Sequence, residues 1–177
     1  LQEVKMSRPN AARRVGAIHR AVPFLAVALL AISAFAQSPD PARGKVKAAA
    51  CEACHGSPER PPLAGTPPLA GQQEEFLALQ MFLFREGLRE APQMAGALNG
   101  FTDWDLVDVA RYFTRQGAAR SISKSESQLN ARGAALAKTM GCGSCHLQDY
   151  SGQKQVPRLT GLPEDYLAAT MMAYRDN

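Results

Sequence analysis

Two short segments of this 177-residue chain share the pattern Cys-x-x-Cys-His, one ending at His55 and the other at His146. Together they use all the cysteines of the chain: Cys51, Cys54, Cys142 and Cys145. Two thiols at this spacing can add across the vinyl groups of one haem, and the histidine that follows can bind the iron as an axial ligand. Two copies that use every cysteine are difficult to explain by chance. The pattern therefore predicts two covalently bound haem c groups.

Two other kinds of cysteine chemistry explain the same residues less well. Zinc ribbons have about 15–20 residues between two Cys-x-x-Cys motifs, whereas 87 residues separate Cys54 from Cys142. A thioredoxin-like dithiol requires a βαβ pattern, and no strand-like segment flanks either motif. Haem attachment is therefore the main prediction, with zinc binding and dithiol chemistry as the alternatives.

The second axial ligand of the first iron has few candidates. The only other histidine is His19, in an N-terminal segment that is expected to be removed, so this ligand must be methionine, another side chain or nothing. Met94 lies in a proline-containing loop and is free to reach an iron. Met81 lies within an apolar helical pattern, where methionine is more often a core residue. We predict Met94 as the ligand and keep Met81 as the alternative.

The second half of the chain offers no comparable methionine. Met140 lies too close to the second motif to reach the opposite face of a haem, and Met171 is the repeat partner of Met81 and is expected in a core. The distal ligand of the second haem therefore stays unassigned. For each motif histidine, the other ring nitrogen should donate to a backbone carbonyl. The candidate carbonyls are those of Pro67 and Pro157, although Pro67 could also be a loop proline without this role.

The elements that position these residues are repeated. The pattern Pro-x-Leu-x-Gly begins at both Pro67 and Pro157, an offset of 90, and the two cysteine motifs have an offset of 91. Between the repeats, residues 121–127 are polar and rich in serine, which is typical of a linker. The predicted boundaries are 37–120 for the first domain, 121–131 for the linker and 132–177 for the second domain.

Apolar periodicity predicts three helices in the first domain, over about 41–50, 73–85 and 102–116. The third begins with a capping-box-like segment from Thr102 to Asp105. Trp104 and Tyr112 are expected to pack this helix against the first one. Strand signals are absent, so the predicted fold class is mainly α, with two tandem domains.

The second domain is expected to be incomplete. By the repeat, Asn177 corresponds to Gly87, within the second long helix, and the partner of Met94 would fall at position 184. A chain that ends within a helix leaves an apolar face uncovered. We therefore expect a fragment whose second domain is truncated at its C-terminus, and keep a much-reduced second domain as the alternative.

Residues 1–36 have the three parts of a secretory signal peptide. Basic residues precede an apolar run over 24–36, and Ala-Phe-Ala at its end forms a cleavage site before Gln37. The thirteen residues of this run fall short of the roughly 20 that span a bilayer, so a cleaved signal is favoured over a membrane anchor. The predicted location is the periplasm, with membranes reached only through a redox partner.

The positive net charge belongs to this leader. The chain has a formal net charge of +4, and residues 1–36 contain five basic residues and one acidic residue. The remainder has 15 residues of each sign and no net charge. Nucleic-acid binding therefore has no support.

Several strings in the chain resemble tandem di-haem class I cytochromes c of the c-four type. They are Cys-x-x-Cys-His-Gly at the first motif, Pro-x-Leu-Ala-Gly-Gln over 67–72, and Phe-Arg-x-Gly-x-Arg leading to Met94. The resemblance covers roughly residues 42–116 and 132–176. It implies two cytochrome c folds, His/Met ligation at each iron, and electron delivery between periplasmic or membrane partners, often towards terminal oxidases. The chain departs from the family pattern at Leu147, which is usually glycine, and at Leu162, which is often glutamine.

The leading prediction is a periplasmic electron carrier between respiratory or dehydrogenase partners and an oxidase. No substrate site is visible in the sequence, so the protein is not expected to be an enzyme. The alternative is a cytochrome subunit of a multi-subunit oxidoreductase. A haem enzyme or gas sensor is a third hypothesis. Either needs an open coordination position at the iron, and the second domain, which has no assigned distal ligand, could supply one.

Overall fold

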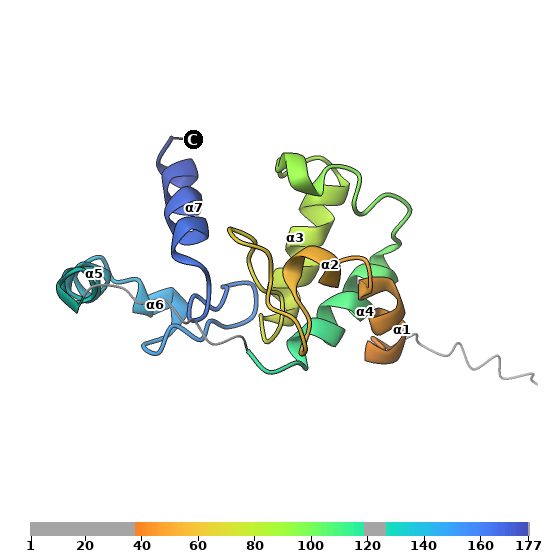
Figure 1. The fold of residues 1–177 in the computed structure, drawn as a ribbon, viewed down its shortest axis with the longest axis horizontal. Coiled ribbons are helices and arrows are strands. Elements are labelled where there is room, and N and C mark those ends of the chain that lie inside the picture. The colour runs from red at the N-terminus through yellow and green to blue at the C-terminus, as the bar shows by residue number, and fades with distance from the viewer. Residues whose placement is uncertain (1–37, 119–126, 177) are drawn as a thin grey trace, which may run out of the picture. The chain divides into compact units, whose positions relative to one another are not determined.

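Three long helices of the first domain pack around one core (Figure 1). The structure is a computed structural model that describes residues 38–118 and 127–176. Its long helices are α1 (Pro41–Ala48), α3 (Glu74–Arg85) and α4 (Asp103–Thr114). Two short elements, α2 (Glu52–His55) and the 3-10 helix η1 (Pro92–Met94), lie between them. The three long helices agree with the predicted ones to within about two residues at each end.

Helix α4 is central because it packs against both α1 and α3. It begins at a capping box, in which the Thr102 hydroxyl accepts the Asp105 N–H at 3.2 Å and the Asp105 carboxylate accepts the Thr102 N–H at 2.9 Å. These two bonds satisfy backbone donors that a helix start leaves without partners. The buried hydrophobic residues of the first domain are Ala48, Leu77, Met81, Leu98, Leu106, Val109, Ala110 and Phe113. Half of them come from the apolar face of α4, as its period predicts.

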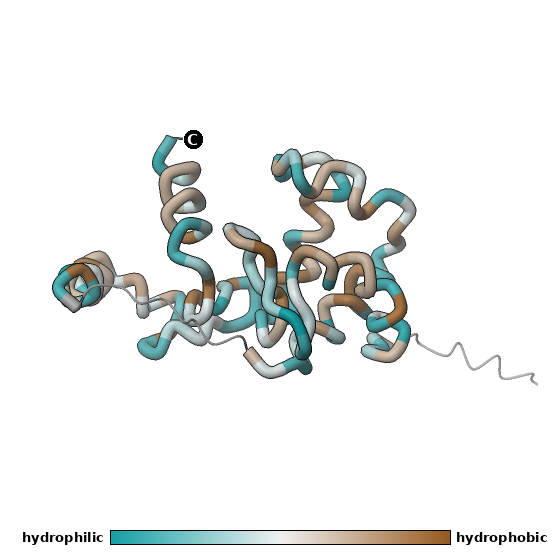
Figure 2. The backbone as a smooth tube through the Cα atoms, in the orientation of Figure 1, coloured by the Kyte–Doolittle hydropathy of each residue, from teal (hydrophilic) through white to brown (hydrophobic). Residues whose placement is uncertain are grey.

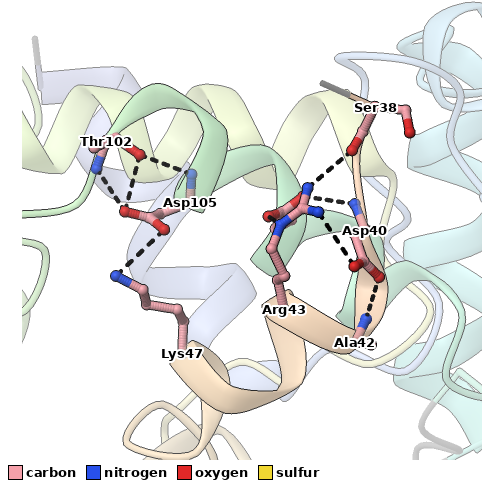
Figure 3. A network of polar contacts seen from close by, with 8 residues as sticks. Ser38, Asp40, Ala42, Arg43, Lys47, Thr102 and Asp105 are labelled. Carbon is pink, nitrogen blue, oxygen red and sulfur yellow. Dashed lines mark hydrogen bonds and ion pairs between the residues drawn. The ribbon is translucent and has the colours of Figure 1, made fainter. Parts of the chain in front are cut away.

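A buried carboxylate joins the start of α1 to the middle of α4. Asp108 on α4 accepts hydrogen bonds from the Asp40 N–H at 2.6 Å and from the Arg43 Nε at 2.7 Å. The Asp40 side chain in turn accepts the N–H of Ala42 and so caps α1. Figure 3 shows Arg43 reaching across to Asp40 and to the carbonyl of Ser38. Because Asp108 is almost fully buried, these partners are what make its burial tolerable.

The second domain contains α5 (Ser127–Thr139), α6 (Gly143–His146) and α7 (Glu164–Asp176). In Figure 2, α7 carries hydrophobic residues along its middle and hydrophilic ones at both ends. None of its residues is buried, and Met171 is 64% exposed. The expectation of a core position for Met171 is therefore wrong. Its repeat partner Met81 is only 9% exposed because α4 packs against α3, and no described helix covers α7 in the same way.

The described residues contain no β-strand, and only two isolated bridges occur in the loops after the cysteine motifs. The chain is therefore mainly α, with two tandem domains, as predicted. The predicted signal over 1–36 and residues 121–126 of the predicted linker lie outside the described residues. Helix α5 begins at Ser127, so residues 127–131, assigned to the linker from sequence, are helical. The domain boundaries themselves stay predictions.

Within the described part of the chain, no helix has both the length and the apolar character needed to span a membrane.

Candidate functional site

The first cysteine motif folds as a single helical turn. Cys51 is the N-cap of α2, and its carbonyl accepts the N–H groups of Cys54 at 3.2 Å and of His55 at 2.9 Å. Residues three apart on a helix lie on the same face, so the two thiols face one way and the histidine follows them. This turn positions two sulfurs and one imidazole on a rigid piece of backbone.

The imidazole of His55 is held by a backbone carbonyl. Its Nδ1 lies 2.8 Å from the carbonyl oxygen of Pro67, which confirms the partner expected from sequence. A carbonyl only accepts hydrogen bonds, so Nδ1 carries the proton and Nε2 keeps its lone pair. The pKa of His55 is lowered because burial disfavours the imidazolium, although the bond to Pro67 acts in the opposite direction. With Nδ1 engaged by the carbonyl, Nε2 is the ring nitrogen that can bind a metal.

The two thiols of the first motif differ in their surroundings. Cys51 is half-buried and packs against the hydrophobic core, whereas Cys54 is exposed. Burial raises the pKa of Cys51, and the neighbouring Glu52 adds to the effect. Both cysteines are free in the structure rather than joined in a disulfide. The pair is thus available for thioether bonds.

Glu52, which lies between the two cysteines, fastens the motif to α4. Its carboxylate accepts the hydroxyl of Tyr112 at 2.6 Å, and its backbone carbonyl accepts an Arg60 guanidinium N–H at 2.7 Å. Burial, followed by the hydrogen bond to Glu52, raises the pKa of Tyr112 to about 12. Sequence reasoning placed Tyr112 between helices but missed this bond, because the two residues lie 60 positions apart.

The second motif repeats this geometry. Cys142 is the N-cap of α6, and its carbonyl accepts the N–H of His146 at 3.1 Å. The Nδ1 of His146 lies 2.8 Å from the carbonyl oxygen of Pro157, the same distance as in the first domain, so this prediction is also confirmed. Cys142 is half-buried and Cys145 is exposed. Each domain therefore presents the same set of two thiols and one fixed imidazole.

The methionines occupy different kinds of position. Met81 is a core residue of α3, as expected, whereas Met94 ends the 3-10 helix η1 and is only partly buried against the core. Met140 and Met172 of the second domain are at least half exposed. Nothing in these positions tests ligation, so Met94 stays the predicted ligand of the first iron and the second distal ligand stays unassigned.

The donor set suits haem better than zinc. Among the described residues, no three His, Cys, Asp or Glu side chains come together as a metal-ligand group. A zinc ion bound by protein side chains alone needs about four such donors. A haem already supplies four nitrogen ligands to its iron. From the protein it needs an axial ligand, which one imidazole can provide, and two thiols for covalent attachment.

Known proteins similar to this chain include several named cytochrome c4. The chain is 36% identical to cytochrome c4 of Pseudomonas aeruginosa over 146 residues, which cover 77% of this chain and 72% of that protein. It is 30% identical over 165 residues to the thiosulfate dehydrogenase electron acceptor of Thiomonas intermedia, covering 86% of this chain and 75% of that protein. No protein-family model matches the sequence.

Solved structures show the same fold. Reduced recombinant cytochrome c4 from Pseudomonas stutzeri matches with a TM-score of 0.69 and 30% identity, covering 78% of this chain and 82% of that one. The thiosulfate dehydrogenase TsdBA from Marichromatium purpuratum matches with a TM-score of 0.64 and 30% identity, covering 76% of this chain and 33% of that one.

Proposed function

Since this chain belongs to the cytochrome c4 family of di-haem class I cytochromes c, which transfer electrons rather than catalyse reactions, we propose that it carries electrons between redox proteins in the periplasm. As a member of the family it carries two covalently bound haem c groups. Bound haem supplies a one-electron couple between ferric and ferrous iron. The observation that supports the proposal most directly is the repeated site, in which each motif histidine is fixed at 2.8 Å by a proline carbonyl.

The residues of the chain have separate tasks in this proposal. Cys51 and Cys54 hold the first haem, and Cys142 and Cys145 hold the second. His55 and His146 bind the two irons through Nε2, because Nδ1 of each ring is engaged by a carbonyl. That bond fixes the ring orientation and raises the basicity of the ligand. Met94 completes the first site, where a thioether sulfur stabilises ferrous iron and raises the reduction potential.

The attachment sites can be tested by counting haems. Protein produced in a host that matures c-type cytochromes should contain two haems per chain in a pyridine haemochrome assay. The double variant Cys142→Ala/Cys145→Ala should contain one, because only the first thiol pair remains. Ser144→Ala lies between the same two cysteines and serves as the matched control that keeps two haems. Two haems in the double variant would contradict the assignment of the second site.

The predicted distal ligand can be tested spectroscopically. Replacing Met94 with alanine should remove the first haem's weak long-wavelength charge-transfer band from sulfur to ferric iron, because that band requires the thioether bond. The control Met81→Leu conserves the core volume and should keep the band. Loss of the band in Met81→Leu but not in Met94→Ala would move the ligand to Met81.

Periplasmic location is also a proposal, and it rests on the leader over residues 1–36. If the signal peptidase cleaves after the Ala-Phe-Ala sequence, N-terminal sequencing of the exported protein should begin at Gln37. A protein that keeps residues 1–36 and fractionates with membranes would contradict this proposal.

A second candidate function is a dedicated electron acceptor or subunit of a dehydrogenase. It is favoured by the similarity to the Thiomonas intermedia protein, whose name describes an acceptor for thiosulfate dehydrogenase. If this function is correct, thiosulfate dehydrogenase and thiosulfate should reduce the protein rapidly, whereas dehydrogenase without thiosulfate should not. A general carrier should instead be oxidised by oxidase-containing membrane vesicles, whichever donor reduced it. Reduction that needs one dehydrogenase, together with co-purification, favours the dedicated role.

A further inference from the structure

Gln72 of the first domain binds the backbone of the second domain. The described residues 38–118 and 127–176 belong to one compact unit, and Gln72 is buried within it with 4% of its surface exposed. Its side-chain Oε1 accepts the N–H of Arg158 at 2.7 Å, and its Nε2 donates to the carbonyl of Arg158 at 3.0 Å. The side-chain amide therefore pairs with both backbone groups of a single residue, in the way that a neighbouring strand would.

Gln72 is itself fixed to the core of the first domain. Its carbonyl accepts the hydroxyl of Thr114, at the end of α4, at 2.8 Å. The preceding Gly71 donates its N–H to the carbonyl of Phe113 at 2.9 Å. A Cβ added at Gly71 would lie 2.5 Å from the Cα of Ala118, so the close approach requires glycine. Gln72 thus contacts the second domain from a rigid position.

The Arg158 N–H belongs to the same peptide group as the Pro157 carbonyl. That carbonyl accepts the Nδ1–H of His146 at 2.8 Å. Because a peptide group is planar and conjugated, an acceptor on its N–H polarises the group and makes its carbonyl a stronger acceptor. A continuous series of bonds therefore runs from Gln72 through one peptide group to the proximal histidine of the second site.

The first domain has no equivalent of this series. Pro68 stands at the repeat position of Arg158, and proline has no N–H to donate. Leu162 stands at the repeat position of Gln72, and leucine has no amide to accept such a bond. The first repeat therefore lacks the backbone donor, and the second repeat lacks the side-chain amide that would accept from it. The series of hydrogen bonds consequently runs only from the first domain to His146.

We propose that Gln72 is a positioning residue of the first domain that strengthens the Pro157–His146 hydrogen bond and thereby lowers the reduction potential of the second haem, but not that of the first. A stronger bond at Nδ1 gives the imidazole more anionic character and favours ferric iron. This inference rests on the proposal that His146 binds the second iron. The Gln72 side-chain amide would then account for part of a difference in reduction potential between the two haems.

The test replaces Gln72 with methionine, which conserves the length of the side chain, is only a weak acceptor for the Arg158 N–H and has no N–H to donate. The potential of each haem is measured by potentiometric titration, and the single-haem variant Cys142→Ala/Cys145→Ala identifies the titration of the first haem. In Gln72→Met, the ferrous-to-ferric ratio of the second haem at fixed solution potential should rise about threefold, because only part of the effect of one hydrogen bond is transmitted through the peptide group to the imidazole. The first haem should not change.

Gln73→Met is the matched control. Gln73 also bonds across the domains, from its Nε2 to the Ser151 carbonyl at 2.9 Å. That peptide group reaches only the backbone carbonyl of His146, through the Gly152 N–H, and not the imidazole ring. This variant should leave both potentials unchanged. If Gln73→Met shifts the second haem as much as Gln72→Met does, the effect comes from loosened domains and the inference is wrong. Equal potentials in Gln72→Met and the unsubstituted protein would also overturn it.

A second readout separates this inference from the proposed function. In the reduced protein, the NMR signal of the His146 Nδ1 proton should move upfield in Gln72→Met, because a weaker hydrogen bond shields the proton. Gln72→Leu introduces the residue found in the second repeat and should give the same shift if Gln72→Met does not fold. A His146 proton that does not move contradicts the inference while leaving haem attachment intact. An unsubstituted protein with no second haem would instead contradict the proposed function.

Discussion

At the scale of single residues, the two haem sites differ just after the histidine. Gly56 has φ 82° and ψ 167°, and Leu147 has φ 67° and ψ 163°. This left-handed, extended region is open almost only to glycine. The first domain therefore uses the residue that the backbone requires, whereas the second holds a leucine there under strain. The surrounding turn imposes the conformation, since the Gly152 N–H bonds to the His146 carbonyl at 2.9 Å.

The variant Leu147→Gly should stabilise the protein by about 1–2 kcal/mol, because release of the strain exceeds the entropy that glycine adds to the unfolded chain. Little burial is lost, since Leu147 is exposed. Denaturant unfolding of the holoprotein measures the change. The converse variant Gly56→Ala should destabilise, because its Cβ would lie 2.7 Å from the Pro62 nitrogen. A lower midpoint for Leu147→Gly would show that the leucine side chain contributes more than its backbone conformation costs.

At the scale of elements, α4 organises the first domain. It covers α1 and α3, supplies Asp108 to the start of α1, and through Tyr112 anchors Glu52 of the first motif. Its N-terminal end is held by the capping box and by Arg85 of α3, whose guanidinium donates to the Asp103 carboxylate at 2.7 Å. Loss of α4 would therefore release one of the contacts that hold the first cysteine motif in place.

Thr102→Ala should destabilise the first domain by about 1 kcal/mol, because it leaves the Asp105 N–H without its acceptor. Thr102→Ser keeps the hydroxyl and should retain most of the stability. Thermal unfolding of both variants, with haem content measured in parallel, provides the comparison. Equal loss in the two variants would mean that the threonine methyl group, rather than the cap, supplies the stabilisation.

At the scale of the whole molecule, burial is uneven. Every hydrophobic residue of the described core lies between Ala48 and Phe113, in the first domain. The second domain is held to the first by hydrogen bonds from Gln72, Gln73 and Arg158, the last donating from its Nε to the Gly71 carbonyl at 3.1 Å. Opening should therefore begin in the second domain.

Amide hydrogen exchange should reflect this difference. Amides of α4 such as Val109 and Ala110 should exchange at least about tenfold more slowly than those of α7, because few buried contacts oppose local opening of α7. Exchange of the holoprotein followed by mass spectrometry of its peptides gives both rates. Equal protection of α4 and α7 would contradict the uneven distribution of stability.

Some expectations from sequence failed for identifiable reasons. Trp104 was expected to pack between helices, yet it is 43% exposed. The buried stripe of α4 runs through Leu106, Val109, Ala110 and Phe113, and position 104 falls outside that helical period. Its place in the helical period, rather than its apolar character, therefore decides its exposure. Met171 was misjudged because its neighbours, rather than its own helix, decide whether it is buried.

Local sequence patterns predict the cofactor class and the short-range structure of this protein. Cofactor class, both motif histidines, the three helices of the first domain and the carbonyls of Pro67 and Pro157 all follow from patterns within short stretches, because covalent spacing and helical period are local properties. The tertiary structure alone decided how the two repeats differ in their connections. Gln72 and Arg158 are 86 positions apart, and a hydrogen bond between such residues depends on how the folded chain brings them together.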